Sequence, residues 1–208
     1  MTVTVRTNMS SWLERFEGSS GLLGLFAELL AARHQQVVND WVISLLHLQP
    51  KDRVLEIDFG PGFALRKISG IVKEGFVAGI TPSEPLWRHA GSRNRAAIQA
   101  GRLELRVGTA HALPYPDASF DKAFSVNSIQ LWMDPTYDLK EIERVVKKGG
   151  MIAVTFQPPS FEENPRTEGD GVGDQLAARF RQAGWSEVRI LKKPAQPADM
   201  ICVLGVKP

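Results

Sequence analysis

A short glycine-containing loop, Asp58-Phe59-Gly60-Pro61-Gly62, follows an apolar run and is the segment best suited to bind a ligand. Gly60 and Gly62 carry no Cβ, so a ligand can approach their main-chain atoms closely. A helix after the loop would add the positive end of its dipole. A tight strand-to-helix turn without a ligand has the same composition, so other residues must decide between the two interpretations.

Two other kinds of chemistry fit the sequence poorly. The dinucleotide fingerprint G-x-G-x-x-G, begun at Gly60, requires a glycine at position 65, where the sequence has leucine. The histidines His34, His47, His89 and His111 are dispersed, and none has metal-ligand spacing. We therefore expect neither a nicotinamide cofactor nor a metal. No arrangement of Ser, Cys or His marks a nucleophile, so the catalytic residues stay unassigned.

Predicted strands and helices alternate around this loop. Apolar residues at helical spacing predict a helix over 22–48, which ends at a turn. Strands are predicted at 53–57, 75–80, 103–107, 120–126, 151–156, 188–191 and 200–206. Further helices are predicted at 64–72, 84–100, 136–146 and 174–183. We expect Gly149 and Gly150 to form a turn, and the Gly- and Pro-rich segment 158–173 to be a loop.

This alternation predicts an α/β fold: a doubly wound, Rossmann-like and mostly parallel sheet with a C-terminal antiparallel hairpin. Ligands bind such sheets beyond the carboxyl ends of the strands, where the glycine loop lies. The chain of 208 residues is long enough for one sizeable core. We expect a polar N-terminal arm over 1–20 and a single domain over 21–208.

Composition limits the partners. The formal net charge of +2 is too small to indicate nucleic acid. Neither a membrane-spanning run nor the apolar part of a signal peptide is visible, so we expect a cytoplasmic protein that does not enter membranes. The single cysteine, Cys202, excludes an intrachain disulfide and lies in an apolar run typical of a buried side chain. The sequence does not indicate an oligomeric state.

Five sequence blocks resemble those of class I S-adenosylmethionine (SAM)-dependent methyltransferases, in the same order and at similar spacing. The blocks are VLEIDFGPG at 54–62, VAGITPS at 77–83, GTAHALP at 108–114, DASFD at 117–121 and EIERVVKKGG at 141–150. The resemblance covers roughly residues 35–160 and is greatest to small-molecule enzymes of the methyltransferase-domain-11 type. It implies a methyltransferase fold, SAM as cofactor and a small-molecule acceptor.

Carried over position by position, the resemblance implies a set of cofactor-binding residues. They are Glu56, Asp58, Phe59, Gly60, Gly62, Thr81, Pro82, Thr109, Ala110, His111 and Asn127. Three positions depart from the family pattern. Asp58 replaces the first glycine of the loop, Thr81 replaces the acid that grips the ribose hydroxyls, and Thr109 replaces an Asp near the adenine. The Asp58 carboxylate could pair with the ammonium group of the cofactor or obstruct the pocket.

The sequence leaves two alternatives to a small-molecule enzyme. The departures at Asp58, Thr81 and Thr109 favour a non-catalytic or repurposed relative that binds another small ligand or a protein partner. The intact glycine blocks favour the enzyme. An RNA methyltransferase lacks support, because the chain has neither an appended RNA-binding module nor a strongly basic balance. Near the fourth strand, Gln130 is expected to orient a ligand, and Trp132 and Trp41 could form an aromatic wall.

Overall fold

The computed structural model describes residues 35–157, 165–195 and 198–208. Residues 38–208 form one compact unit, and residues 1–37 form another, of which only 35–37 are described. The predicted arm over 1–20 and its boundary therefore lie outside the described residues. So do residues 22–34 of the first predicted helix, whose described part is helical over 35–45.

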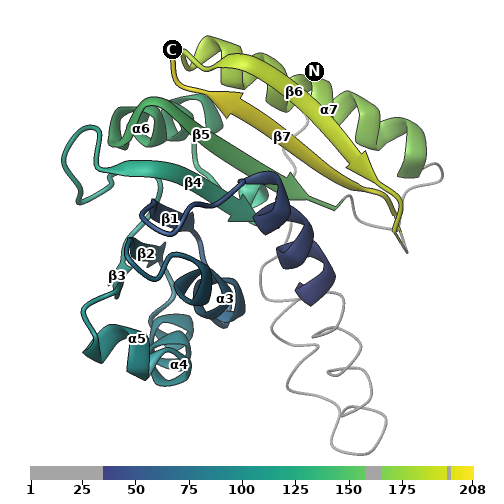
Figure 1. The fold of residues 1–208 in the computed structure, drawn as a ribbon. Helices are drawn as coiled ribbons and strands as arrows, with labels where there is room; N and C mark the ends of the chain where they lie inside the picture. The colour runs from purple at the N-terminus through teal and green to yellow at the C-terminus, as the bar shows by residue number, and fades with distance from the viewer. Residues whose placement is uncertain (1–34, 158–164, 196–197) are drawn as a thin grey trace, which may run out of the picture. The chain divides into compact units, whose positions relative to one another are not determined.

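A seven-stranded sheet in the order β3-β2-β1-β4-β5-β7-β6 forms the centre of the fold (Figure 1). Its strands are β1 Arg53–Ile57, β2 Phe76–Thr81, β3 Leu103–Val107, β4 Phe120–Val126, β5 Val146–Phe156, β6 Ser186–Lys193 and β7 Met200–Val206. The first five pair in parallel, whereas β7 is antiparallel to both β5 and β6. The predicted doubly wound sheet with an antiparallel hairpin at one edge is confirmed.

Helices cover both faces of the sheet. They are α3 Phe63–Ile71, α4 Glu84–Arg93, α5 Arg95–Gln99, α6 Pro135–Val145 and α7 Pro165–Gln182, with a 3-10 turn, η1, at Ile129–Leu131. Successive side chains of β1 point to opposite faces of the sheet. Leu55 packs in a cluster with residues of α6 and α7. Val54 packs in a second cluster with residues of the helix over 35–45 and of α3. Strands buried on both faces explain the near-continuous apolar runs in the sequence.

The helix predicted over 84–100 is in fact two helices that meet at Asn94. The Asn94 backbone is not helical, with φ −107° and ψ 14°. Its side-chain amide donates to the carbonyl of Gly62, 3.1 Å away, and to that of Ala90, 2.9 Å away. Asn94 therefore exchanges helical geometry for a bond to the glycine loop, an alternative that Asn side chains offer readily.

The prediction of a loop over 158–173 is wrong for residues 165–173, because α7 begins at Pro165, and residues 158–164 lie outside the described residues. Three glycines in this segment lower its helix propensity, but packing overrides propensity. At Gly173, a Cβ would lie 3.4 Å from Ile190 of β6 and from Ile201 of β7. The small residue lets the helix approach the hairpin closely.

The turn predicted at Gly149 and Gly150 is a bulge inside β5. The strand begins at Val146, opposite Phe120, and pairing resumes at Met151, opposite Lys122. Gly149 has φ +74°, and its N–H donates to the Lys207 carbonyl. The extra residues thus stay hydrogen-bonded to the segment that follows β7, and β5 covers Val146–Phe156 where the sequence predicted a strand over 151–156.

Candidate functional site

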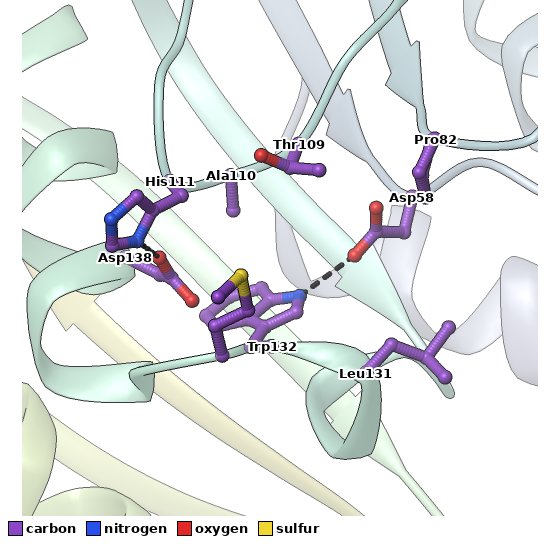
Figure 2. A pocket seen from close by; sticks show the side chains of 9 residues that line it. Asp58, Pro82, Thr109, Ala110, His111, Leu131, Trp132 and Asp138 are labelled. Atoms are coloured by element: carbon purple, nitrogen blue, oxygen red, sulfur yellow. Dashed lines mark hydrogen bonds and ion pairs between the residues drawn. The ribbon is translucent and has the colours of Figure 1, made fainter.

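A pocket opens beyond the carboxyl ends of the parallel strands. Its lining residues follow β1, β2, β3 and β4 or belong to α6, and Figure 2 shows their side chains. They are Asp58, Pro82, Thr109, Ala110, His111, Leu131, Trp132, Met133 and Asp138. The enclosed space measures about 40 Å³, and about 290 Å³ when the open mouth and the adjoining solvent are included. This is the region in which open α/β sheets bind ligands.

Asp58 is the residue with which β1 leaves the sheet. Its φ of +52° lies in the left-handed region, which Asp tolerates better than most non-glycine residues. The Trp132 indole N–H donates to Asp58 Oδ2 over 2.8 Å, as the dashed line in Figure 2 shows. Burial raises the pKa of the Asp58 carboxyl to about 6, and the charge of Asp138 adds to this. Hydrogen bonds from Trp132 and Ser128 lower the pKa and offset part of the shift.

On the opposite side of the pocket, His111 is paired with a buried carboxylate. His111 Nδ1 lies 2.9 Å from Asp138 Oδ1, and the Asp138 side chain is 1% exposed. The imidazole also stacks on Tyr137, with ring centroids 4.3 Å apart. These two contacts hold the ring at the rim of the pocket in one orientation.

Two anchors from α4 hold the glycine loop. Arg93 donates to the Pro61 carbonyl over 2.5 Å, and its guanidinium lies 3.8 Å from the centre of the Phe63 ring. Asn94 donates to the Gly62 carbonyl. The loop conformation is therefore set by groups behind it, away from the pocket lining.

The loop after β3, which carries Thr109 and His111, is anchored by α6. Arg144 donates to the carbonyls of Leu113 and Tyr115, 3.1 and 2.9 Å away. Glu141 accepts from the Leu113 N–H over 2.9 Å and pairs with Arg144. The hydrogen bond from Arg144 lowers the pKa of Glu141, so the pair stays charged at neutral pH.

Five of the predicted cofactor residues line the pocket: Asp58, Pro82, Thr109, Ala110 and His111.

Three others lie in the interior of the domain. Glu56 is buried in β1, and its Oε2 has no hydrogen-bond partner among the described residues. Burial raises the pKa of Glu56 to about 8. Phe59 is fully buried, so close to Gly79 that a Cβ there would lie 2.7 Å from the Phe59 ring. Thr81 is 1% exposed, and its hydroxyl accepts from the Ser83 N–H over 3.4 Å.

The remaining three bound the region without lining the pocket. Gly60 has open space where a Cβ would stand. Gly62 has φ +83°, and a Cβ there would lie 2.7 Å from Asn94 and 2.8 Å from Ala90. The Asn127 side chain accepts from the Gln157 N–H over 3.0 Å, which ties the ends of β4 and β5 together. Gly62 is thus required by helix packing, whereas Gly60 leaves its main chain accessible.

The sequence did not identify Asp138 as a pocket residue. The predicted aromatic wall of Trp132 and Trp41 is wrong. Trp132 belongs to the core cluster on one face of the sheet, and Trp41 packs on the cluster of the other face, so the two form no shared wall. Asp138 is four residues before the buried Ile142 of α6. An acid on the apolar stripe of an amphipathic helix was the signal that could have identified it. Gln130 donates to the Asn127 carbonyl and is exposed.

No group of three or more His, Cys, Asp or Glu side chains among the described residues could hold a metal ion. None of the described helices combines the length and apolar character that crossing a membrane requires.

Comparison with known proteins adds a family relationship to this geometry. Residues 55–154 match the family described as Methyltransferase domain. The chain is 30% identical over 184 residues to an uncharacterized methyltransferase, YdaC, of Bacillus subtilis, covering 88% of this chain and 99% of the relative. It is 29% identical to a 27-O-demethylrifamycin SV methyltransferase of Amycolatopsis mediterranei, covering 71% of this chain and 58% of that protein.

Among solved structures, the fold is similar to that of a SAM-dependent methyltransferase from Aquifex aeolicus. The TM-score is 0.67 at 20% sequence identity, covering 82% of this chain and 89% of that one. At this identity the likeness concerns the fold.

Proposed function

Because the chain belongs to the class I SAM-dependent methyltransferase family, we propose that it transfers the methyl group of SAM to a small organic acceptor, with SAM held in the pocket between Asp58 and His111. One observation carries this assignment of the site. Residues predicted from three separate sequence blocks, Asp58, Pro82 and Thr109 to His111, come together in a single pocket at the ends of three adjacent strands.

The residues present fit an adenosyl cofactor in two respects. The main chain at Gly60 borders open space, so a ligand can lie against it. The Asp58 carboxylate reaches the pocket and can accept a charged group. In a third respect they fit less well: the buried hydroxyl of Thr81 replaces the charged ribose ligand of the family. We therefore expect dissociation constants for SAM in the micromolar range or weaker, because charge-assisted bonds contribute more than neutral ones.

When bound, SAM would supply an electrophilic methyl carbon, which an acceptor nucleophile attacks in line as the carbon–sulfur bond breaks and S-adenosylhomocysteine leaves. The protein has to align the two molecules and exclude water. Trp132 and Ala110 give the pocket an apolar floor, and His111, held by Asp138, offers a ring nitrogen at the rim. A general base is needed only for a weakly nucleophilic acceptor, and His111 is placed to serve as one.

The Amycolatopsis relative supports the acceptor class, because its name gives a small organic molecule, 27-O-demethylrifamycin SV, as its substrate. Cytoplasmic location and the absence of a nucleic-acid partner stay predictions from the sequence.

Titration calorimetry with SAM and S-adenosylhomocysteine tests the proposal. Gly60→Val fills the open space beside the loop and is expected to weaken SAM binding at least tenfold. Gly70→Val is the matched control, because Gly70 lies exposed in α3 with nothing within 4 Å of its would-be Cβ. The control should bind as the wild type does. Absence of heat from the wild type at millimolar SAM would instead favour the repurposed relative.

A further inference from the structure

The proposed SAM pocket contains acidic side chains and no permanent cation. Of the described residues that line it, Asp58 and Asp138 are acids, and none is Lys or Arg. Asp138 is paired with His111, but Asp58 has only neutral hydrogen-bond donors around it, Trp132 and Ser128. A largely buried carboxylate without a counter-ion is costly, because neutral donors replace only part of its hydration.

Backbone conformation adds to this cost. Asp58 has φ +52°, a conformation that glycine adopts without strain. The side chain therefore occupies a position where its presence brings both strain and desolvation. Such combinations concentrate at functional sites, where a ligand supplies the compensating interaction.

The carboxylate is also positioned to receive a ligand. One oxygen, Oδ2, accepts from Trp132 Nε1, which fixes the plane of the group. The second oxygen points away from the indole in Figure 2. Behind this pair, the Ser128 hydroxyl is hydrogen-bonded to that of Ser125, and both serines are buried. The orientation of Asp58 is thus set by neutral groups while its charge remains unpaired.

We propose that Asp58 is the counter-ion of a cationic group on the bound ligand and makes the pocket select ligands that carry such a group. Resting on the proposed function, that ligand is SAM, whose ammonium and sulfonium both carry positive charge. Asp58 is then a specificity-determining residue rather than an obstruction. S-adenosylhomocysteine can tell which of the two cationic groups is paired with Asp58, because it keeps the ammonium and lacks the sulfonium.

Calorimetry on Asp58→Asn tests this inference with three ligands: SAM, S-adenosylhomocysteine and the uncharged 5′-methylthioadenosine. Asn has the same shape, tolerates positive φ and can still accept from Trp132. The variant is expected to bind SAM at least tenfold more weakly, whereas the affinity for methylthioadenosine changes less than about twofold. An equal loss for S-adenosylhomocysteine identifies the ammonium as the paired group. A loss confined to SAM identifies the sulfonium.

Glu74→Gln is the control for loss of one negative charge, since Glu74 is an exposed acid in the turn between α3 and β2. It should leave all three affinities unchanged. Asp58→Gly, which removes the strain as well, should lose SAM selectivity and unfold no earlier than the wild type. Equal weakening of SAM and methylthioadenosine in both variants, or SAM binding unchanged in Asp58→Asn, would overturn the inference. Failure of the wild type to bind SAM would overturn the proposed function as well and is seen before any variant is made.

Discussion

Replacing Glu56 by Gln should stabilise the protein at neutral pH and remove part of its pH dependence. Glu56 is buried in β1, and burial raises the pKa of its carboxyl from 4.5 to about 8. Between these values the unfolded chain has lost the proton while the folded chain keeps it. Stability is therefore full below about pH 4.5, falls as pH rises toward 8 and is constant above that.

The size of the effect follows from the shift. At pH 7, which is 2.5 units above the pKa of 4.5 in the unfolded chain, the folded protein still holds the Glu56 proton. Keeping that proton lowers the free energy of unfolding by about 3 kcal/mol, at about 1.36 kcal/mol per pH unit. Gln has nearly the same shape and carries no titrating proton. The amide of Gln adds a cost that does not depend on pH, so we expect the Glu56→Gln variant to gain about 2 kcal/mol relative to the wild type between pH 5.5 and pH 7.

Urea unfolding of both proteins between pH 5.5 and 8.5 measures this difference, with Glu74→Gln as the exposed control. The control should follow the wild-type curve at every pH. If the free energy of unfolding of Glu56→Gln stays parallel to that of the wild type at every pH, Glu56 is ionised in the folded state. Its unpaired oxygen would then have found a donor, and the argument from burial would be wrong.

Two further predictions concern the loops that hold the pocket. Gly62→Ala should destabilise the protein by about 2–3 kcal/mol, because the new Cβ is both at positive φ and in contact with Ala90 and Asn94. Gly101→Ala, with φ +67° and open space, should lose only about 1 kcal/mol, and equal losses by thermal unfolding would refute the packing argument. Arg144→Met should lower stability by about 2 kcal/mol, because it leaves two carbonyls without their donor and removes the cation beside Glu141. It should also weaken SAM binding through the loop that carries His111, and unchanged calorimetry with a lowered melting temperature would separate the two effects.

The positions of the strands, the type of sheet and the location of the pocket could be predicted because they depend on local patterns. Apolar runs that alternate with segments of helical periodicity indicate a parallel sheet. Such a sheet places the carboxyl ends of all its strands at one edge. Motif positions at those ends, such as Asp58 and Thr109, then lie together whatever their side chains are. This is why five predicted residues share one pocket.

The parts that could not be predicted depend on contacts between distant segments. Asn94 ends α4 because its side chain finds the Gly62 carbonyl, 32 residues away in the sequence. Gly173 is helical where α7 packs closely against the β6–β7 hairpin. Asp138 lines the pocket because α6 turns its N-terminal part toward His111. In each case the deciding partner is remote in the sequence.

The departures from the family pattern can be understood in the same terms. Asp58 keeps a positive φ, the backbone conformation that a glycine at this point would adopt freely, so the loop retains its path while a carboxylate is added. Thr81 keeps its place at the end of β2, where its hydroxyl accepts the Ser83 N–H just before α4 begins. Both changes preserve the main chain and alter only the charge that the site offers. Measured against the family pattern, negative charge is lost at Thr81 and Thr109 and gained at Asp58, whose carboxylate faces the pocket beside Trp132. That exchange predicts a site that still selects the charged end of SAM while holding its ribose less tightly.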